Sequence, residues 1–300
     1  MPNRNDQSSI RVISSLEELV SVLRQCNQSI LSLHQYSSDD FKAVNGCIRY
    51  FHEQANAVLQ GLSGITNIHS NQKDALQAQA KLAIANISHI VTKLQFHDII
   101  RQKLEHVQDT NQYVMEELLL SISNHSGHQQ YKYIPVIPDI VRLHAAQLIA
   151  AEITYRQTFA EINMCLQSIG AANCIIAEAG QKYSLVKSNT ANENTALETV
   201  IRLSKKMAVQ VSGLLSTGME NGSFSALIKE TSGLLGTLQI NIPATLLDSA
   251  GSYTETLQSL KNLYTMESER VIFDQVIRGE KLSGMYTDQE KDTDENIELF

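Results

Sequence analysis

Apolar residues recur along this chain at the three- and four-residue spacing of an α-helix. Ile84, Ile87, Val91 and Leu94 step by three, four and three, which is the spacing of a coiled-coil seam. The same stepping returns late in the chain, at Leu246, Ala250, Tyr253, Leu257, Leu260 and Tyr264. No sustained alternation of β-branched residues predicts a strand. The pattern therefore predicts an all-α protein.

Capping signals set the expected helix ends in the first half of the chain. The capping box Ser15-Leu-Glu-Glu18 predicts a first helix that ends near His34. A second start signal, Ser37-Ser-Asp-Asp40, predicts a long segment that reaches about Ser123. Bends or breaks inside this segment are expected at Gly61, Gly64, Ser70 and Asn71.

Proline and polar runs set the expected helix ends in the second half. Pro138 suits the first turn of a third long helix, which is expected to end at about Tyr183. The polar stretch 188–194 predicts a linker, and shorter helices are expected over 195–219 and 224–238. A last helix is expected to open at Asn241 and Pro243.

These elements predict four regions: an N-terminal helix (1–36), a long helical hairpin (37–185), C-terminal helices (186–278) and an acidic tail with an apolar end (279–300). Only four prolines interrupt the chain, so the helices are expected to be long. The predicted fold is a long antiparallel helical bundle of coiled-coil type. The seam either pairs with a helix of its own chain or completes a four-helix bundle in a homodimer.

Composition narrows the function classes. The net charge of −8 argues against a nucleic-acid surface and against an anionic membrane face. The N-terminal residues contain no apolar signal region, and no run approaches the roughly 18 apolar residues of a membrane span. Cys26, Cys47, Cys165 and Cys174 form no CxxC pair and predict thiols in a reducing compartment. A cytoplasmic protein is expected.

Motif searches give no metal site. The string HEQAN begins at His52 and Glu53, but Asn56 stands where a zincin needs its second histidine. The string is similar to the HExxN pattern of histidine-kinase dimerisation helices, yet no glycine-rich ATP-binding region follows. The histidines include no pair at i and i+4, so neither a metal nor a cofactor of its own is expected.

The stretch TKLQFHDIIRQKLEHVQDT, residues 92–110, carries the candidate chemistry. Asp98 and Gln102 lie one helical turn apart, and Asp98 continues the line of the seam through Val91 and Leu94. A buried, unpaired carboxylate is costly. The bundle is therefore expected to open here, with Asp98, Gln102 and Glu105 on a hydrated face.

The string QFHDIIRQKLEHV, residues 95–107, resembles the active-site helix of CheZ-type phosphatases of bacterial chemotaxis. Phe96, Asp98 and Gln102 match the aromatic-x-Asp-x-x-x-Gln pattern of that family. The resemblance implies docking on a phosphorylated CheY-like response regulator, with Gln102 orienting the water that attacks the phosphoaspartate. It implies that Asp98 pairs with a lysine of the regulator. The regulator would also supply the Mg²⁺. Phe96, Arg101 and Glu105 would contact the partner.

The end of the chain, DTDENIELF, is similar to the receiver-tethering peptide of the same phosphatases. Ile297, Leu299 and Phe300 would be its apolar anchors, and a tether would raise the local concentration of the partner. An inert acidic tail explains the same composition.

Two other strings also indicate chemotaxis signalling, but they imply no particular reaction. VRLHAAQL (141–148) and YTMESERVI (264–272) resemble segments of chemotaxis-associated helical proteins. The alternative function is therefore a non-catalytic signalling adaptor or scaffold of coiled-coil type. A purely structural coiled coil is the third hypothesis.

Overall fold

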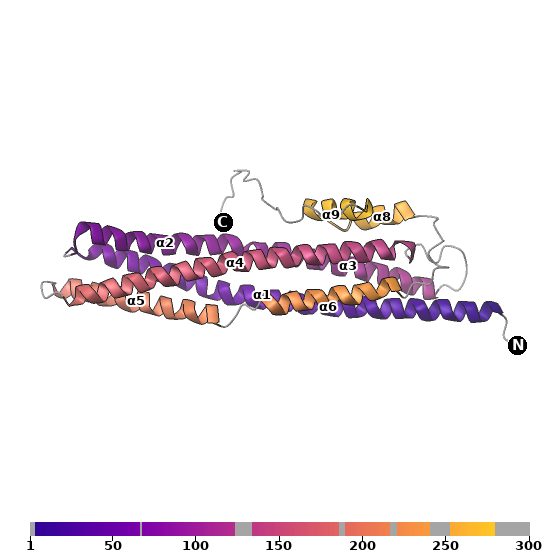
Figure 1. Cartoon of the computed structure of the whole chain (residues 1–300), viewed down its shortest axis with the longest axis horizontal. Helices are drawn as coiled ribbons and strands as arrows, with labels where there is room; N and C mark the ends of the chain where they lie inside the picture. The colour runs from indigo at the N-terminus through magenta and orange to yellow at the C-terminus, as the bar shows by residue number, and fades with distance from the viewer. Residues whose placement is uncertain are drawn as a thin grey trace. The chain divides into compact units, whose positions relative to one another are not determined.

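The structure is a computed structural model and describes residues 4–66, 68–123, 134–185, 190–216, 221–240 and 253–279. Helices occupy nearly all of these residues, and no strand occurs among them, which confirms the all-α prediction. The elements are α1 (Arg4–Gly64), α2 (Ser70–Leu94), α3 (Phe96–Ser123), η1 (Ile134–Val136), α4 (Ile137–Ser184), α5 (Ala191–Ser216), α6 (Asn221–Ile240), α8 (Tyr253–Lys261) and α9 (Glu267–Ile277) (Figure 1).

Helix α1 runs without a break through both predicted start signals, so the expected helix end near His34 is wrong. Ser37 is buried, and its hydroxyl donates to the carbonyl of His34 at 3.3 Å within the helix. Asp40 accepts a hydrogen bond from the Tyr155 hydroxyl of α4. Capping residues leave a helix uninterrupted when their polar groups find partners of this kind.

The break predicted near Gly64 and Ser70 is confirmed, because α1 ends at the first residue and α2 begins at the second. Lys73 closes this turn: its Nζ donates to the carbonyls of Ser63 at 2.8 Å and Ile65 at 2.7 Å. A cation at carbonyls that a helix end leaves unpaired is favourable.

In the second half, α4 begins one residue before Pro138 and ends at Ser184, as expected. Helix α5 begins at Ala191, inside the stretch predicted as a linker. Where one last helix was expected, the described residues form α8 and α9. The Leu263 N–H donates to Leu260 and the Tyr264 N–H to Lys261, and these turn hydrogen bonds end α8. The predicted opening at 241–243 lies outside the described residues.

The chain divides into two compact units. Unit 1 comprises Met1–Ile30, Lys103–Ile153 and Ile228–Phe300, and unit 2 comprises Leu31–Gln102 and Thr154–Leu227. Residues of α1, α3, α4 and α6 contribute to both units. The boundary predicted at 36/37 therefore coincides with no helix end.

Unit 2 has a core built from α1, α2, α4 and α5, and Figure 1 shows these helices running alongside one another. One cluster of buried apolar side chains joins all four: Val58, Leu62, Ile65, Ile68, Leu76, Ala80, Ile176, Leu197, Val200 and Leu203. A single chain thus supplies four helices to this core, and the cluster needs no second chain to complete it.

Two glycines allow the close approach of α5 in unit 2. A Cβ at Gly61 of α1 would lie 2.6 Å from Cγ2 of Val200, and one at Gly180 of α4 would lie 2.6 Å from Cγ1 of Ile201. Both distances are too short for carbon atoms. Small residues at these positions therefore set how closely α5 packs.

The seam predicted on α2 is displaced around the helix. The buried residues of α2 are Leu76, Ala80, Ala83, Ile87 and Ile90, whereas Val91 is 47% exposed. Ile84 and Leu94 are half-buried. Small alanines form part of the real seam, and a search for large apolar residues passes over them.

Helix α4 is long and apolar enough to span a membrane by length and composition. However, 72% of its most apolar window is buried inside the protein, so the helix is weak evidence for a membrane span. The helix was predicted, but not as a candidate span, because charged residues interrupt its apolar run. Location in the cytoplasm stays a prediction.

Candidate functional site

The candidate site begins at the junction of α2 and α3. Gln95 lies between the two helices with helical dihedral angles, φ −65° and ψ −25°. The N–H of Gln95 donates to Thr92 O at 3.2 Å, and the N–H of Asp98 donates to Gln95 O at 3.2 Å. These bonds span three residues, as in a 3₁₀-helix, and the tighter turn rotates α3 relative to the α2 pattern. Asp98 thereby lies in the first turn of α3, where a carboxylate is favourable.

The junction places Asp98 and Gln102 in solvent. Val91, Gln95, Asp98 and Gln102 are spaced by four, three and four residues, and all are exposed. The side chain of Asp98 keeps 69% of its surface accessible. The predicted hydrated face is therefore present for these two residues, and Asp98 does not occupy the buried seam. Both functional groups can reach another molecule.

Asp98 is held only lightly by its neighbours. Arg101 Nε lies 3.5 Å and His97 Nδ1 lies 3.9 Å from Asp98 Oδ1. The Arg101 side chain is 43% exposed. Ion pairs this open to water contribute little stability, so another cation can replace Arg101 at small cost.

The opposite side of the same turn is anchored in the core of unit 2. The His97 ring lies 4.8 Å from the Phe41 ring of α1, which in turn lies 4.8 Å from Phe159 of α4. Burial lowers the pKa of His97; Asp98 opposes this shift, and Arg101 and Lys42 add to it. His97 is therefore a neutral anchor at pH 7, and it fixes the direction in which Asp98 points.

Phe96 is half-buried rather than freely exposed. Lys93 Nζ lies 5.1 Å from the centre of its ring and 2.7 Å from Glu161 Oε2 on α4. His89 Nε2 also approaches this carboxylate, at 3.3 Å. The aromatic position of the motif is thus already engaged by a cation of α2.

The remaining predicted site residues are not gathered here. Glu105 is half-buried and belongs to the part of α3 in unit 1. Ile297, Leu299 and Phe300 lie outside the described residues.

Among the described residues, no group of three or more His, Cys, Asp and Glu side chains is placed to hold a metal ion. Asn56 Nδ2 lies 3.4 Å from the ring nitrogens of His52, so the HEQAN string forms a contact within α1. The four cysteines are unpaired thiols, and burial raises the pKa of Cys26 to about 12. None of these groups carries a catalytic arrangement.

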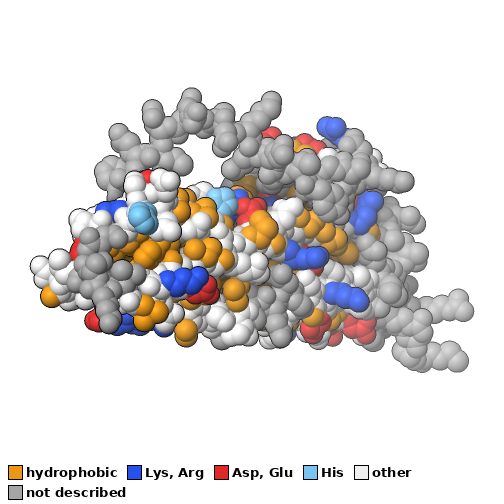
Figure 2. Space-filling model, turned by 60° about the vertical axis from the view of Figure 1, so that its left-hand side comes forward, with side chains coloured by type: hydrophobic (Ala, Val, Ile, Leu, Met, Phe, Trp, Pro, Cys, Tyr) orange, Lys and Arg blue, Asp and Glu red, His pale blue; other side chains and the backbone are white. Residues whose placement is uncertain are grey.

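Exposed large apolar side chains of unit 2 include Leu82 and Val91 on α2 and Met164 and Ile175 on α4. Figure 2 shows hydrophobic side chains interspersed with polar and charged ones on the face that it presents. Scattered exposure of this kind is ordinary for protein surfaces.

A buried polar cluster in unit 1 escaped the sequence analysis. Glu269 of α9 is fully buried; its Oε2 lies 2.6 Å from His106 Nδ1, and its backbone carbonyl accepts from Gln147 Nε2 at 3.2 Å. Thr110 Oγ1 of α3 lies 3.3 Å from the hydroxyl oxygen of Tyr264. The signal was present in the sequence, because Glu269 lies three and four residues before Ile272 and Phe273, on the apolar face of its helix.

Comparison with known proteins adds no identity. No protein-family model matches the chain, and neither a curated protein nor a solved structure matches it.

Proposed function

We propose that this protein binds a phosphorylated CheY-like response regulator and accelerates hydrolysis of its phosphoaspartate. The observation that carries the proposal is the exposure of Asp98 and Gln102 one turn apart on α3, beside a firmly packed His97. The resemblance of residues 95–107 to the active-site helix of CheZ-type phosphatases is the reason for assigning phosphoaspartate hydrolysis to this pair.

Gln102 is the catalytic residue in this proposal. Its carboxamide enters the receiver's active site, accepts a hydrogen bond from a water molecule and donates one to a phosphoryl oxygen. Acyl-phosphate hydrolysis needs little covalent help, so a water held in line with the breaking bond accounts for the acceleration. The receiver supplies the phosphoaspartate and the Mg²⁺. This division of labour explains a catalytic residue that lies on an open surface.

Asp98 orients the complex. On docking, a lysine of the receiver takes the place of Arg101, whose ion pair with Asp98 is 3.5 Å long and open to solvent. Arg101 and the half-buried Phe96 then border the contact. The apolar end of the tail, with Ile297, Leu299 and Phe300, tethers the receiver, and a homodimer would carry two such sites.

The test measures phosphate release from a purified, phosphorylated receiver with and without the protein. We expect Gln102→Ala to abolish the acceleration while receiver binding persists, and Asp98→Ala to weaken binding. Gln112→Ala is the matched control, because Gln112 is an exposed glutamine of the same helix. Equal phosphate release by wild type and Gln102→Ala would remove the catalytic role.

Binding that survives Gln102→Ala, with no acceleration by the wild type, would instead identify an adaptor. Absence of receiver binding would leave only a structural coiled coil. Deletion of residues 292–300 tests the tether separately, since unchanged receiver affinity would exclude it.

A further inference from the structure

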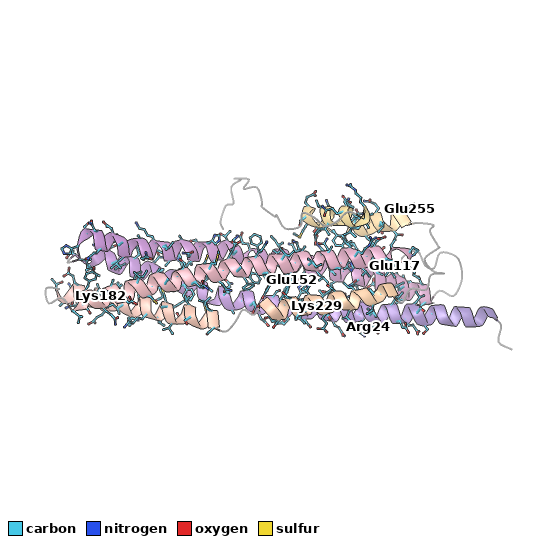
Figure 3. The ribbon with its side chains drawn as sticks, in the orientation of Figure 1. Arg24, Glu117, Glu152, Lys182, Lys229 and Glu255 are labelled. Atoms are coloured by element: carbon cyan, nitrogen blue, oxygen red, sulfur yellow. The ribbon has the colours of Figure 1, made fainter. Side chains whose placement is uncertain are left out.

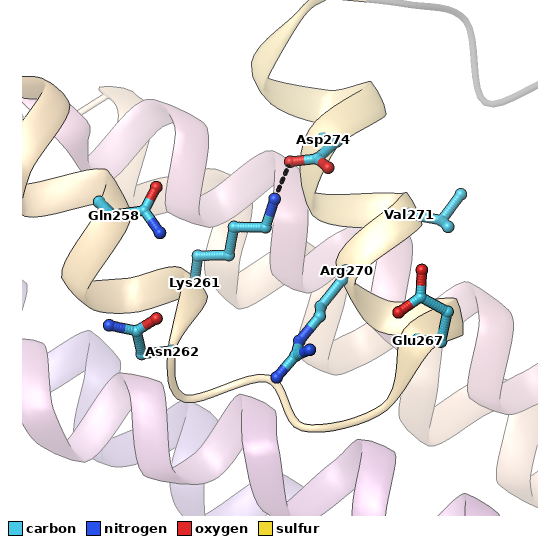
Figure 4. A pocket seen from close by; sticks show the side chains of 7 residues that line it. All are labelled: Gln258, Lys261, Asn262, Glu267, Arg270, Val271 and Asp274. Atoms are coloured by element: carbon cyan, nitrogen blue, oxygen red, sulfur yellow. Dashed lines mark hydrogen bonds and ion pairs between the residues drawn. The ribbon is translucent and has the colours of Figure 1, made fainter.

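Helices α8 and α9 border an open pocket of about 380 Å³ on the surface of unit 1 (Figure 4). This volume lies in the range of small-molecule sites, roughly 300–1,000 Å³. Its lining is almost entirely polar and consists of Gln258, Lys261, Asn262, Glu267, Arg270, Val271 and Asp274. Two cations, two carboxylates and two amides therefore face the same small volume.

One pair of charges in this lining is already satisfied. Lys261 Nζ donates to Asp274 Oδ1 at 2.6 Å, and it lies 5.9 Å from the centre of the Phe273 ring. Figure 4 shows this ion pair bridging from α8 to α9 along one side of the pocket. This ion pair has no net charge, so it leaves neither group available to a ligand.

The second pair of charges is separated. Glu267 and Arg270 are three residues apart on α9, where opposite charges normally meet. Arg270 Nε instead donates to the Tyr264 carbonyl at 2.9 Å. Among the described residues, the Glu267 carboxylate has no hydrogen-bond or ion-pair partner, and the terminal nitrogens of Arg270 have none. An unpaired carboxylate and the open end of a guanidinium therefore border one pocket.

Buried residues anchor the helix that carries these charges. Tyr264, whose carbonyl fixes Arg270, is fully buried, as is Glu269 between the two charged residues. The Glu269 carboxylate accepts from the Met266 N–H at 3.4 Å and from the His106 ring. The side chains of Glu267 and Arg270 are exposed, and a helix that is anchored to α3 presents them to solvent.

We propose that this pocket binds a small zwitterion of the α-amino-acid class. The ligand's carboxylate meets the two terminal nitrogens of Arg270 in a bidentate contact, and its ammonium group meets the Glu267 carboxylate. The amides of Gln258 and Asn262 face a polar side chain. A ligand with a single charge would pair with one of these two residues and leave the other without a partner.

The experiment is isothermal titration calorimetry on the full chain with each standard L-amino acid, up to about 10 mM, which covers affinities of order 1 mM. We expect saturable binding of a polar amino acid such as L-glutamine. Acetate and methylammonium carry one charge each, and we expect their affinity to be lower by at least roughly tenfold.

Substitutions then locate the binding. Glu267→Gln and Arg270→Gln are each expected to weaken affinity roughly tenfold, because each removes a charge-assisted contact. Glu255→Gln and Arg24→Gln are the charge-matched controls; both residues are exposed, and Figure 3 labels them on α8 and α1. The proposal is overturned if no amino acid binds, if acetate alone binds as tightly, or if the pocket variants bind like the controls.

Discussion

The two units differ in what fills their interiors. The core cluster of unit 2 is apolar, and it reaches close contact through Gly61 and Gly180. The interior of unit 1 contains fully buried polar side chains: Thr110, Asn111, His144, Gln147 and Glu269. Segments of α1, α3, α4 and α6 contribute to both. Unit 2 also buries Ser37, Asn173 and Ser204, so the two units differ in the size of the buried polar groups rather than in their presence.

This difference indicates which substitutions should destabilise each unit. In unit 2, stability depends on volume, since an apolar interior loses or gains free energy with each methyl group. In unit 1, stability depends in addition on whether the larger buried polar groups are paired. Both ring nitrogens of His144 and both amide atoms of Asn111 have no hydrogen-bond partner among the described residues. Polar groups that are buried without partners are destabilising.

The largest effect is expected from a cavity in unit 2. Phe159 is fully buried, and its ring lies 4.6 Å from that of Tyr155. We expect Phe159→Ala to lower the free energy of unfolding by about 3–5 kcal/mol in urea denaturation. Ile175→Ala, at a residue 49% exposed on the same helix, is the control, with an expected change within about 0.5 kcal/mol. Similar losses in the two variants would contradict an apolar, volume-limited core.

The next effect comes from overpacking. Gly61→Ala would bring a methyl group to 2.6 Å from the β-branched Val200, and we expect a loss of about 1–3 kcal/mol in unfolding free energy. Gly46→Ala is the matched change on α1, and nothing lies within 4 Å of its Cβ. It is expected to gain about 0.5–1 kcal/mol from helix propensity. Effects of the same sign in urea denaturation would refute the close approach of α5.

A change of opposite sign is expected in unit 1. Burial lowers the pKa of His144 to about 3, so the ring is neutral and its two nitrogens are unpaired among the described residues. His144→Leu replaces it with an apolar side chain of similar volume, and we expect a gain of about 1 kcal/mol at pH 7. Thermal or urea unfolding measures it. A loss would show that these nitrogens are paired in solution, for instance by buried water.

The smallest effect is a pH dependence of unit 1. The hydrogen bond to Glu269 raises the pKa of His106; desolvation opposes the shift, and the charges of Glu269, Asp109 and Glu105 add to it. The charged ring therefore stabilises the fold fully below the unfolded pKa of about 6.5. This contribution is lost as the pH rises through the higher folded pKa.

The measurement compares the unfolding free energy of wild type and His106→Gln at about pH 6 and about pH 9. The difference between the two proteins should shrink at the higher pH. His144 acts in the opposite direction, since its lowered pKa favours the unfolded state as the pH falls. Because both proteins contain it, its contribution cancels in the difference. A difference that is constant with pH would exclude a charged His106–Glu269 pair.

Much of the fold followed from local sequence. The absence of strand patterns predicted the all-α class, and Gly64 with Ser70 predicted the turn after α1. Pro138 predicted the start of α4. Each of these signals acts on the backbone of neighbouring residues, so no distant contact was needed to interpret it.

Other features depended on distant partners. Ser37 and Asp40 have the chemistry of a helix start, but a carbonyl one turn back and Tyr155 of α4 satisfy them inside α1. Val91 is apolar yet exposed, because Ile87 and Ile90 are the residues that α2 buries. Local chemistry specifies what a side chain can bind, whereas packing decides what it does bind.

For the candidate site, the sequence determined that a carboxylate and an amide lie one turn apart on a helix, because that spacing follows from helical geometry alone. Only the tertiary structure decided that Asp98 and Gln102 point into solvent, because the three-residue turn at Gln95 and the contact of His97 with Phe41 set the rotation of α3. The same holds for the α8–α9 pocket, since a backbone carbonyl at the turn between the two helices keeps Arg270 away from Glu267.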